Sequence, residues 1–260
     1  MTAVRLSGSR ALRVLERNAR VQRERWWIPI LGMAEPFLFL FSIGVGVGEL
    51  VGVVDGDGGT AVDYQTFVAP ALLASSAMNT AVFGCCFDFF AKYKWVNTYD
   101  QMLATPIGTD DILRGETAWI LLRVLVSAVA FTITMTAMGL VESWWGVLLP
   151  PTALLVAFAF SGAGFLAATY LRSWLDWDLV YLAVIPLFLF SASFFPLSQY
   201  PDAVAWIVRV TPLYHGVDLC RDLALGTIGW GAFVSIAYLT AMGTATTAAA
   251  NHRLKPMLTP

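Results

Sequence analysis

The sequence predicts an all-α integral membrane protein with six transmembrane helices. Of its 260 residues 58% are hydrophobic, and the mean hydropathy is +0.68. Charged residues make up 13% of the chain, about half the share of a soluble domain. Because a soluble domain of this size leaves much of its surface in water, so apolar a chain is expected to have lipid as its solvent.

Six segments are long and apolar enough to cross a bilayer, which takes roughly 20 mostly apolar residues as a helix. They are residues 27–47, 64–87, 117–140, 147–171, 179–195 and 227–249. Residues 27–250 therefore form one predicted transmembrane domain, with segments 1–26 and 251–260 on either side. The tight turn between the third and fourth spans carries Trp144 and Trp145, residues typical of a membrane interface.

The distribution of basic residues predicts that both termini are cytoplasmic, because cytoplasmic loops carry an excess of Lys and Arg. The loop after the first span holds four acidic residues and no basic one. Basic residues are concentrated before the first span, after the second and fourth, and in the tail: Arg5, Arg10, Arg13, Arg17, Arg20, Arg23, Arg25, Lys92, Lys94, Arg114, Arg172, Arg253 and Lys255.

Residues 1–26 are predicted to form an amphipathic helix on the inner surface of the membrane. Arg10, Arg13, Arg17 and Arg20 recur at helical spacing beside a modest apolar stripe, the pattern of a helix on anionic lipid. A disordered basic leader is the alternative. No small-residue cleavage site follows the first apolar run, so the first span is expected to stay in the mature protein.

Glu35 stands inside the first span and is followed by Pro36. A carboxylate in the bilayer costs several kcal/mol, so it is expected to face protein or water. It is either a gating or substrate-path residue, or a structural group at the proline kink. Arg123 in the third span is a possible partner, although it could equally extend its charge to the interface.

The inner connection, residues 88–116, is predicted to contain a short helix parallel to the membrane. Thr98 is a suitable cap for it, and Pro106 disfavours helix in the residue before it. We expect it to expose Tyr99, Met102 and Leu103 to a partner groove; an ordinary amphipathic connector is the alternative. The predicted docking residues are Thr98, Tyr99, Asp100, Gln101, Met102 and Leu103.

The outer stretch, residues 196–226, is too apolar for a free loop. Residues 203–210 and 213–225 are expected to be re-entrant or interfacial helices, whose backbone groups satisfy themselves. His215, Asp218 and Asp222 share one helical face, with Arg221 nearby. A catalytic His–Asp pair is conceivable, but a polar cluster that anchors a re-entrant helix fits better because no nucleophile accompanies it.

The sequence contains no motif for a nucleotide, metal or redox site. The chain has no Gly-Lys pair and hence no phosphate-binding loop. Two histidines are too few for a multi-histidine metal centre, and the three cysteines form neither a redox pair nor a zinc motif. A net charge of −2 gives no indication of a nucleic-acid partner. If transport uses ATP, another polypeptide must hydrolyse it.

Six stretches in the same order resemble the permeases of ABC-2 type transporters, in the branch of the NodJ and daunorubicin-resistance membrane subunits. They extend nearly from end to end of the chain, and their order makes them specific together. They are Glu35-Pro-Phe-Leu-Phe-Leu, Ala69-Pro-Ala-Leu-Leu-Ala-Ser-Ser-Ala-Met, Tyr99-Asp-Gln-Met-Leu-Ala-Thr-Pro, Gly115-Glu116, Phe188-Leu-Phe-Ser-Ala-Ser-Phe-Phe-Pro-Leu and Thr211-Pro-Leu-Tyr-His-Gly-Val-Asp.

This resemblance implies an exporter in the bacterial inner membrane, built from two permease subunits, identical or different, and two separate ATPase subunits. The ATPases would bind ATP and Mg, so this chain would hold no cofactor. Residues Thr98–Leu103 would be the coupling helix that fits a cleft in the ATPase. The family exports lipids, glycans, lipid-linked oligosaccharides or amphipathic drugs.

The sequence is also compatible with two other functions. One is an ion-coupled secondary transporter that uses Glu35, although such proteins often have repeated halves and no convincing repeat is present. The other is a membrane-embedded enzyme that acts on lipids through His215 and Asp218.

Overall fold

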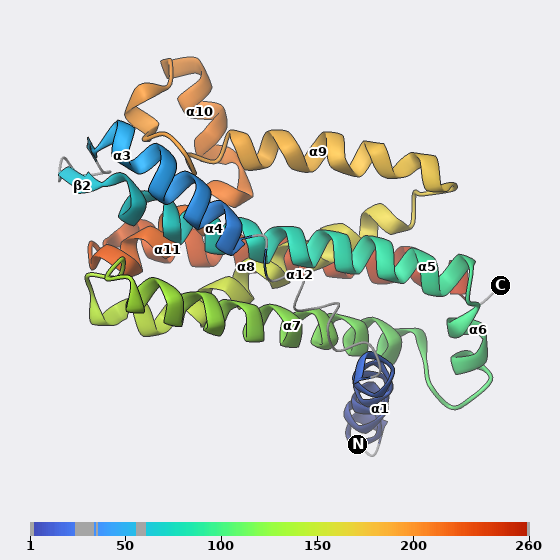
Figure 1. Ribbon diagram of the computed structural model, residues 1–260. Helices are drawn as coiled ribbons and strands as arrows, with labels where there is room; N and C mark the ends of the chain where they lie inside the picture. Colours follow the sequence, from blue (N-terminus) through green and yellow to red (C-terminus); the bar gives the residue numbers. More distant parts are fainter. Residues whose placement is uncertain (1–2, 24–33, 35, 56–60, 259–260) are drawn as a thin grey trace.

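The computed structural model describes residues 3–23, 34, 36–55 and 61–258, which are mostly helical (Figure 1). A helix from Pro36 to Val51 includes a π-helical stretch, Leu40–Val47, and α3, Gly48–Val51. The remaining helices are α1 (Ala3–Arg23), α4 (Tyr64–Phe83), α5 (Phe89–Lys94), α6 (Thr98–Leu103), α7 (Thr109–Ala137), α8 (Leu149–Ala168), α9 (Trp177–Leu189), α10 (Asp202–Val210), α11 (Pro212–Leu225) and α12 (Trp230–Leu258).

Four helical segments in the described part of the chain are long and apolar enough to cross a membrane: Tyr64–Lys94, Thr109–Ala137, Trp144–Ala168 and Trp230–Leu258. They correspond to the second, third, fourth and sixth predicted spans. The first and fifth correspond to shorter apolar helices, Pro36–Val51 and Trp177–Leu189, and residues 27–33 of the first lie outside the described residues. Of the six predicted full-length spans, four are therefore confirmed by length.

The fifth predicted span ends earlier than the sequence suggested, at Leu189 instead of residue 195. Pro186 lies inside its last turn, where it removes a backbone donor. Ala192 then has a left-handed backbone with φ 54°, which ends the helical path. The chain continues into α10 and α11, so the helical state of both predicted outer pieces is confirmed.

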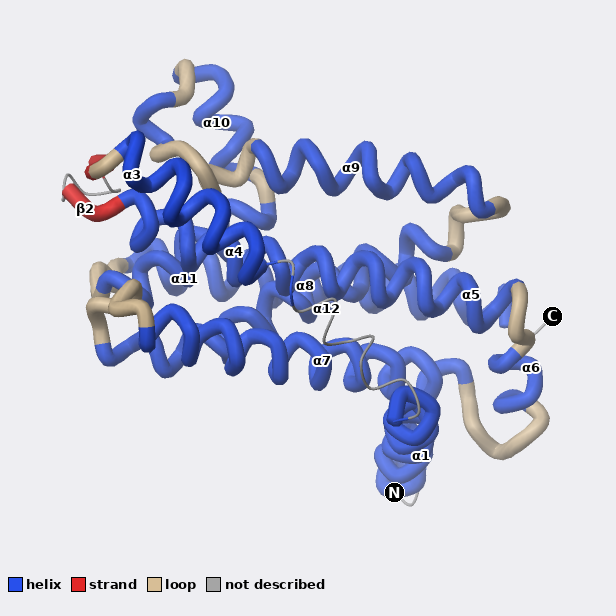
Figure 2. The backbone as a smooth tube through the Cα atoms, viewed as in Figure 1, coloured by secondary structure: helices blue, strands red, loops and turns tan. Residues whose placement is uncertain are grey.

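The long helices lie side by side in a bundle, with α8 packed against α4, α7 and α12 (Figure 2). Two glycines of α8 allow this contact. A Cβ at Gly162 would lie 2.6 Å from the backbone nitrogen of Thr247 in α12, and one at Gly164 would lie 3.1 Å from the carbonyl oxygen of Val82 in α4. These small residues bring helices of one chain together, as close packing in membranes requires.

The fold is not entirely α-helical. Strands β1 (Val53–Asp55) and β2 (Ala61–Asp63) form an antiparallel pair after the first apolar helix, with Val54 opposite Val62. Both of these valines are buried. The sequence analysis did not predict this hairpin, because a pair of three-residue strands leaves too short a pattern to detect; the rest of the described chain is mostly helical.

Two groups of elements mark opposite ends of the bundle. Helix α6 and the C-terminal end of α12 lie at one end, and α1 lies close to this end across α7 (Figure 1). The hairpin, α10 and α11 lie at the other end. This arrangement agrees with termini on one side of the membrane, and the assignment of that side to the cytoplasm stays a prediction.

Candidate functional site

Helix α6 is joined to α5 by a sharp turn at the end of the second long span. That span continues through a π-helical turn, Gly84–Asp88, into α5, so the helix extends to Lys94. Asn97 then has a left-handed backbone with φ 49°, which Asn tolerates better than most residues. Asn97 therefore precedes the helix, and Thr98 is its buried first residue instead of its cap.

Tyr99 is fully buried, at 0% exposure, and Met102 is 7% exposed. The ring of Tyr99 stacks on Phe89 of α5 with 4.9 Å between centroids, and Phe89 meets the edge of Phe165 in α8 at 5.6 Å. The prediction that Tyr99 and Met102 face a partner was wrong, because α6 turns back and packs its apolar side on α5. Burial raises the pKa of the Tyr99 phenol well above its usual value.

The opposite side of α6 is open to solvent. Asp100 and Gln101 are exposed, and Leu103 is half-buried. In the preceding turn Trp95 is 54% exposed and Val96 is 59% exposed. We call Trp95, Val96, Asp100 and Gln101 the α6 outer surface. Trp95 and Val96 were not among the predicted docking residues, although two large apolar residues just after Lys94 were an available signal.

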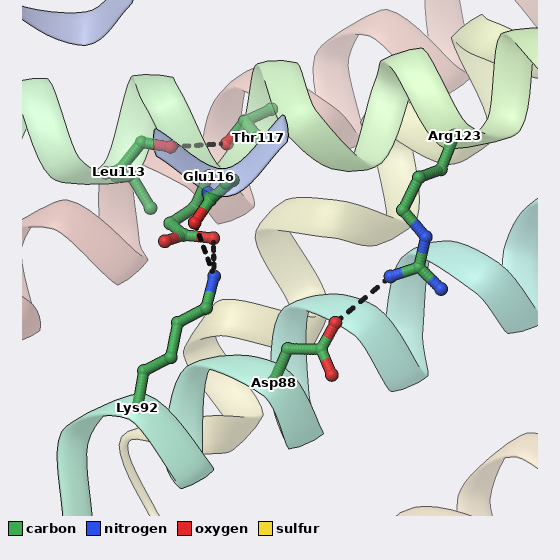
Figure 3. Close-up of polar contacts among 7 residues, drawn as sticks. Asp88, Lys92, Leu113, Glu116, Thr117 and Arg123 are labelled. Atoms are coloured by element: carbon green, nitrogen blue, oxygen red, sulfur yellow. Dashed lines mark hydrogen bonds and ion pairs between the residues drawn. The ribbon is translucent and has the colours of Figure 1, made fainter. Parts of the chain in front are cut away.

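Behind α6, three helices meet at the side chain of Lys92 in α5. Its Nζ donates to Glu116 Oε2 of α7 at 2.6 Å and to Asn18 Oδ1 of α1 at 3.2 Å. The side chains of Lys92 and Glu116 are 22% and 4% exposed, and Figure 3 shows the pair between the two helices. We call Asn18, Lys92 and Glu116 the Lys92 junction.

Close to this junction, α1 crosses α7 at Gly115. A Cβ on Gly115 would lie 2.6 Å from the Cβ of Val14 and 2.9 Å from the carbonyl oxygen of Ala11. Real Cβ atoms essentially never come that close to other atoms, so glycine is needed here. Gly115 thus lets α1 pack closely on α7. Glu116 is linked to Asn18 of α1 through Lys92 of α5.

The C-terminal end of α12 is also attached at this end of the bundle. Asp110, in the first turn of α7, accepts from Asn251 Nδ2 at 2.6 Å and lies 3.3 Å from Lys255 Nζ. The hydroxyl of Tyr93 in α5 donates to the carbonyl oxygen of Met257 at 3.4 Å. Helices α1, α5, α6, α7 and α12 are therefore connected around one region.

Arg123 has a partner that neither alternative anticipated. Its Nη1 donates to Asp88 Oδ2 at 3.0 Å, an ion pair that joins α7 to the turn before α5 (Figure 3). Glu35, the other predicted partner, lies outside the described residues, so its role stays a prediction. The Asp88–Arg123 pair adds a second charged link between the second and third spans.

The polar residues of α11 make contacts with several neighbouring elements. His215 Nδ1 lies 3.1 Å from Ser235 Oγ of α12, and its ring centre lies 4.3 Å from that of Tyr238, with the two rings tilted by 30°. Asp222 accepts from Thr227 at 3.1 Å, and Asp218 lies near Gly231. Ser235 is 1% exposed, so solvent does not reach its hydroxyl in the His215–Ser235 contact.

Arg221 is 3% exposed and packs against α4. Its guanidinium carbon lies 3.7 Å from the ring centre of Phe67 in α4. It donates to the carbonyl oxygen of Ala192 at 3.0 Å and to that of Phe67 at 3.4 Å. Arg221 therefore attaches the left-handed turn at Ala192 to α4. Within the described ranges, no three His, Cys, Asp or Glu side chains gather to hold a metal ion.

Comparison with known proteins gives the family. The model of the family described as "ABC-2 type transporter" matches residues 11–225. The chain belongs to this family. It is a membrane transport subunit of the ABC-2 type, a class that works in general with an ATPase partner and as a dimer.

Several curated relatives carry the name Nodulation protein J. That of Sinorhizobium fredii is 33% identical over 230 residues, which cover 87% of this chain and 85% of the relative. That of Rhizobium leguminosarum bv. viciae is 31% identical over 219 residues, covering 83% and 82%. That of Rhizobium meliloti is 28% identical over 231 residues, covering 87% and 86%. The resemblance drawn from the sequence motifs is confirmed.

Proposed function

We propose that this ABC-2 permease moves an amphipathic substrate outward across the bacterial inner membrane, and that its ATPase partner binds at the α6 outer surface. The observation that carries the proposal is that α6 is buried on one side only. Tyr99 is fully buried against α5, while Asp100 and Gln101 on the same short helix face solvent. A helix held firmly on one side and open on the other is suited to receive a partner.

The contacts behind α6 provide a path for movement into the membrane. Force on α6 passes through the Tyr99–Phe89 stack to α5, which is continuous with α4. From α5 the Lys92 junction reaches α7 and α1. Displacement of α6 would therefore shift the second and third spans together with the helix on the membrane surface. Nucleotide-driven closure of the ATPases would in this way favour the outward-open state.

The substrate class rests on family membership and on relatives named for nodulation. Lipids, glycolipids and amphipathic drugs are the candidates, and a second permease subunit, identical or different, would complete the transport path. ATP and Mg would be bound by the partner ATPase, since the sequence has no phosphate-binding loop.

The test is to place positive charge on the α6 outer surface. In the full complex purified from the native host, Asp100→Arg with Gln101→Arg is expected to abolish ATPase association while the permease inserts and unfolds at its usual temperature. A control is Glu142→Arg with Asp202→Arg. Both residues are exposed; Glu142 is bonded to the end of α11 and Asp202 begins α10, and both helices lie at the opposite end of the bundle (Figure 1). Undiminished ATPase association in the α6 variant, measured by the mass of the intact complex, would refute the docking role.

A further inference from the structure

A lateral groove separates α7 and α12, away from the α6 outer surface. Both helices pack mainly on α8 and less on each other. Between them lies a cavity of about 460 Å³, and its wall includes Leu113, Ala118, Leu121, Phe158 and Ala248. Nothing in the proposed export mechanism uses this groove.

The wall of the groove is apolar even where it carries hydroxyl groups. Thr117 donates to the carbonyl oxygen of Leu113 at 2.8 Å, and Thr244 donates to that of Thr240 at 2.9 Å. These two hydroxyls are satisfied within their own helices, and the third threonine of the wall, Thr247, has a buried hydroxyl, so together they offer little to water. A water molecule needs two to four polar partners to occupy a cavity, and an apolar groove on a membrane helix is filled by hydrocarbon instead.

One end of the groove is charged. Arg114, Asp110 and Asn251 line it, and Lys255 lies 3.3 Å from Asp110. Two cations and one carboxylate leave a net charge of +1 at this rim. A positive rim above an apolar wall matches the phosphate and the acyl chain of an acidic lipid.

The depth of the groove also fits a lipid. Helix α1, predicted to lie on the membrane surface, crosses α7 at Gly115, next to Arg114. Arg114 therefore stands at the level of the phosphate groups. Leu121 is seven residues further along α7 and hence about 10 Å deeper, at the level of the acyl chains.

We propose that this groove binds one acidic glycerophospholipid of the inner leaflet, with its phosphate at Arg114 and Lys255 and an acyl chain between α7 and α12. The lipid would fill the gap between the third and sixth spans and attach the C-terminal end of α12 to α7. Lipid binding needs no ATP, so its measurement is independent of the export proposal.

The experiment is native mass spectrometry of the purified full-length protein, titrated with palmitoyl-oleoyl phosphatidylglycerol or with the phosphatidylcholine of the same acyl chains. Wild type is expected to retain one phosphatidylglycerol more tightly than phosphatidylcholine. Arg114→Gln is expected to weaken phosphatidylglycerol binding about fivefold, and Arg172→Gln, in the exposed loop after α8, to leave it unchanged.

Two size variants distinguish the groove from the rest of the surface. Ala248→Trp fills the groove and is expected to abolish retention of the lipid, whereas Ala249→Trp, exposed on the next face of α12, is expected to preserve it. If Ala248→Trp does not fold, Ala118→Phe with Val126→Phe as its control makes the same comparison from α7. Equal retention by the groove and control variants would overturn the proposal, as would equal affinity for both lipids. The proposal would also be overturned if the groove variants lost a protein subunit while they retained the lipid, because the groove would then be a protein interface.

Discussion

Lys92 and Glu116 form an ion pair of 2.6 Å between α5 and α7, and only 4% of the Glu116 side chain is exposed. The same ammonium group reaches Asn18 of α1. A charge so deeply placed depends on its partner, because removal of one member leaves the other without compensation for its lost hydration. The pair therefore holds together the helices that surround α6.

Removal of either charge is expected to destabilise the protein, whereas removal of both is expected to cost much less. Glu116→Gln should lower the free energy of unfolding by about 3–5 kcal/mol, and Lys92→Met with Glu116→Leu should recover most of it. Glu16→Gln is the matched control, because the Glu16–Arg20 pair is exposed and such pairs contribute about 0–1 kcal/mol. A double-mutant cycle in detergent measures the coupling between the two side chains. If the two single variants each cost less than about 1 kcal/mol and their costs add up in the double variant, a buried pair is excluded.

Gly115→Ala is expected to displace α1 from α7, although alanine is intrinsically better than glycine in a helix by about 1 kcal/mol. The added Cβ would overlap Val14 and the carbonyl of Ala11. Trypsin should then cleave the arginine-rich α1 faster. Gly108→Ala is the control, since its nearest neighbour would be Asp111 Oδ2 at 3.7 Å. A slower cleavage of α1 in Gly115→Ala, or a gain in stability, would contradict the close contact.

Tyr99 gives the protein a pH dependence in the alkaline range. Its pKa is raised by burial, so above pH ~10 the unfolded chain releases a proton that the folded protein keeps. The contribution of the neutral phenol is complete below pH ~10 and is lost as the pH rises towards the folded-state pKa. Wild type is therefore expected to lose about 1.4 kcal/mol per pH unit relative to Tyr99→Phe. Parallel stability curves of the two proteins from pH 9 to 11.5 would show that the phenol is not buried.

Arg221→Lys is expected to be destabilising, although lysine keeps the positive charge. Lysine has no planar group to lie on the Phe67 ring and to reach the carbonyls of Phe67 and Ala192 together. A buried carbonyl left without its donor costs about 1–3 kcal/mol, which thermal unfolding should show. Arg209→Lys, exposed at the end of α10, should have no measurable effect. If both variants unfold at the same temperature, Arg221 does not hold the turn at Ala192.

The positions of the long spans could be predicted from the sequence because apolar length is a local property. Residues 64–87, 117–140, 147–171 and 227–249 all fall largely within long helices of the structure. Their ends could not be predicted as well. The second span continues to Lys94 and the third begins at Thr109, because helical hydrogen bonds persist into polar sequence beyond the apolar core.

The side of α6 that faces outward could not be determined from its sequence. A six-residue helix has fewer than two turns, so Tyr99 and Asp100 could each have been the buried residue until the turn at Asn97 was known. The partners of Arg123 and Lys92 were hidden for a different reason. Asp88 and Glu116 lie 35 and 24 residues away from them, and no local spacing rule reaches that far.

The most direct test of the account is the location and partner of Gln101 in living cells. A photo-crosslinking amino acid at position 101 is expected to join the permease to an ATPase that has a phosphate-binding loop, and the same group at the opposite end, at Glu142, is expected not to. Gln101→Cys should react with a membrane-impermeant maleimide only after the membrane is opened, with low background because Cys85, Cys86 and Cys220 are buried. Labelling of Gln101→Cys in intact cells, or an adduct with the ATPase only from position 142, would contradict the account.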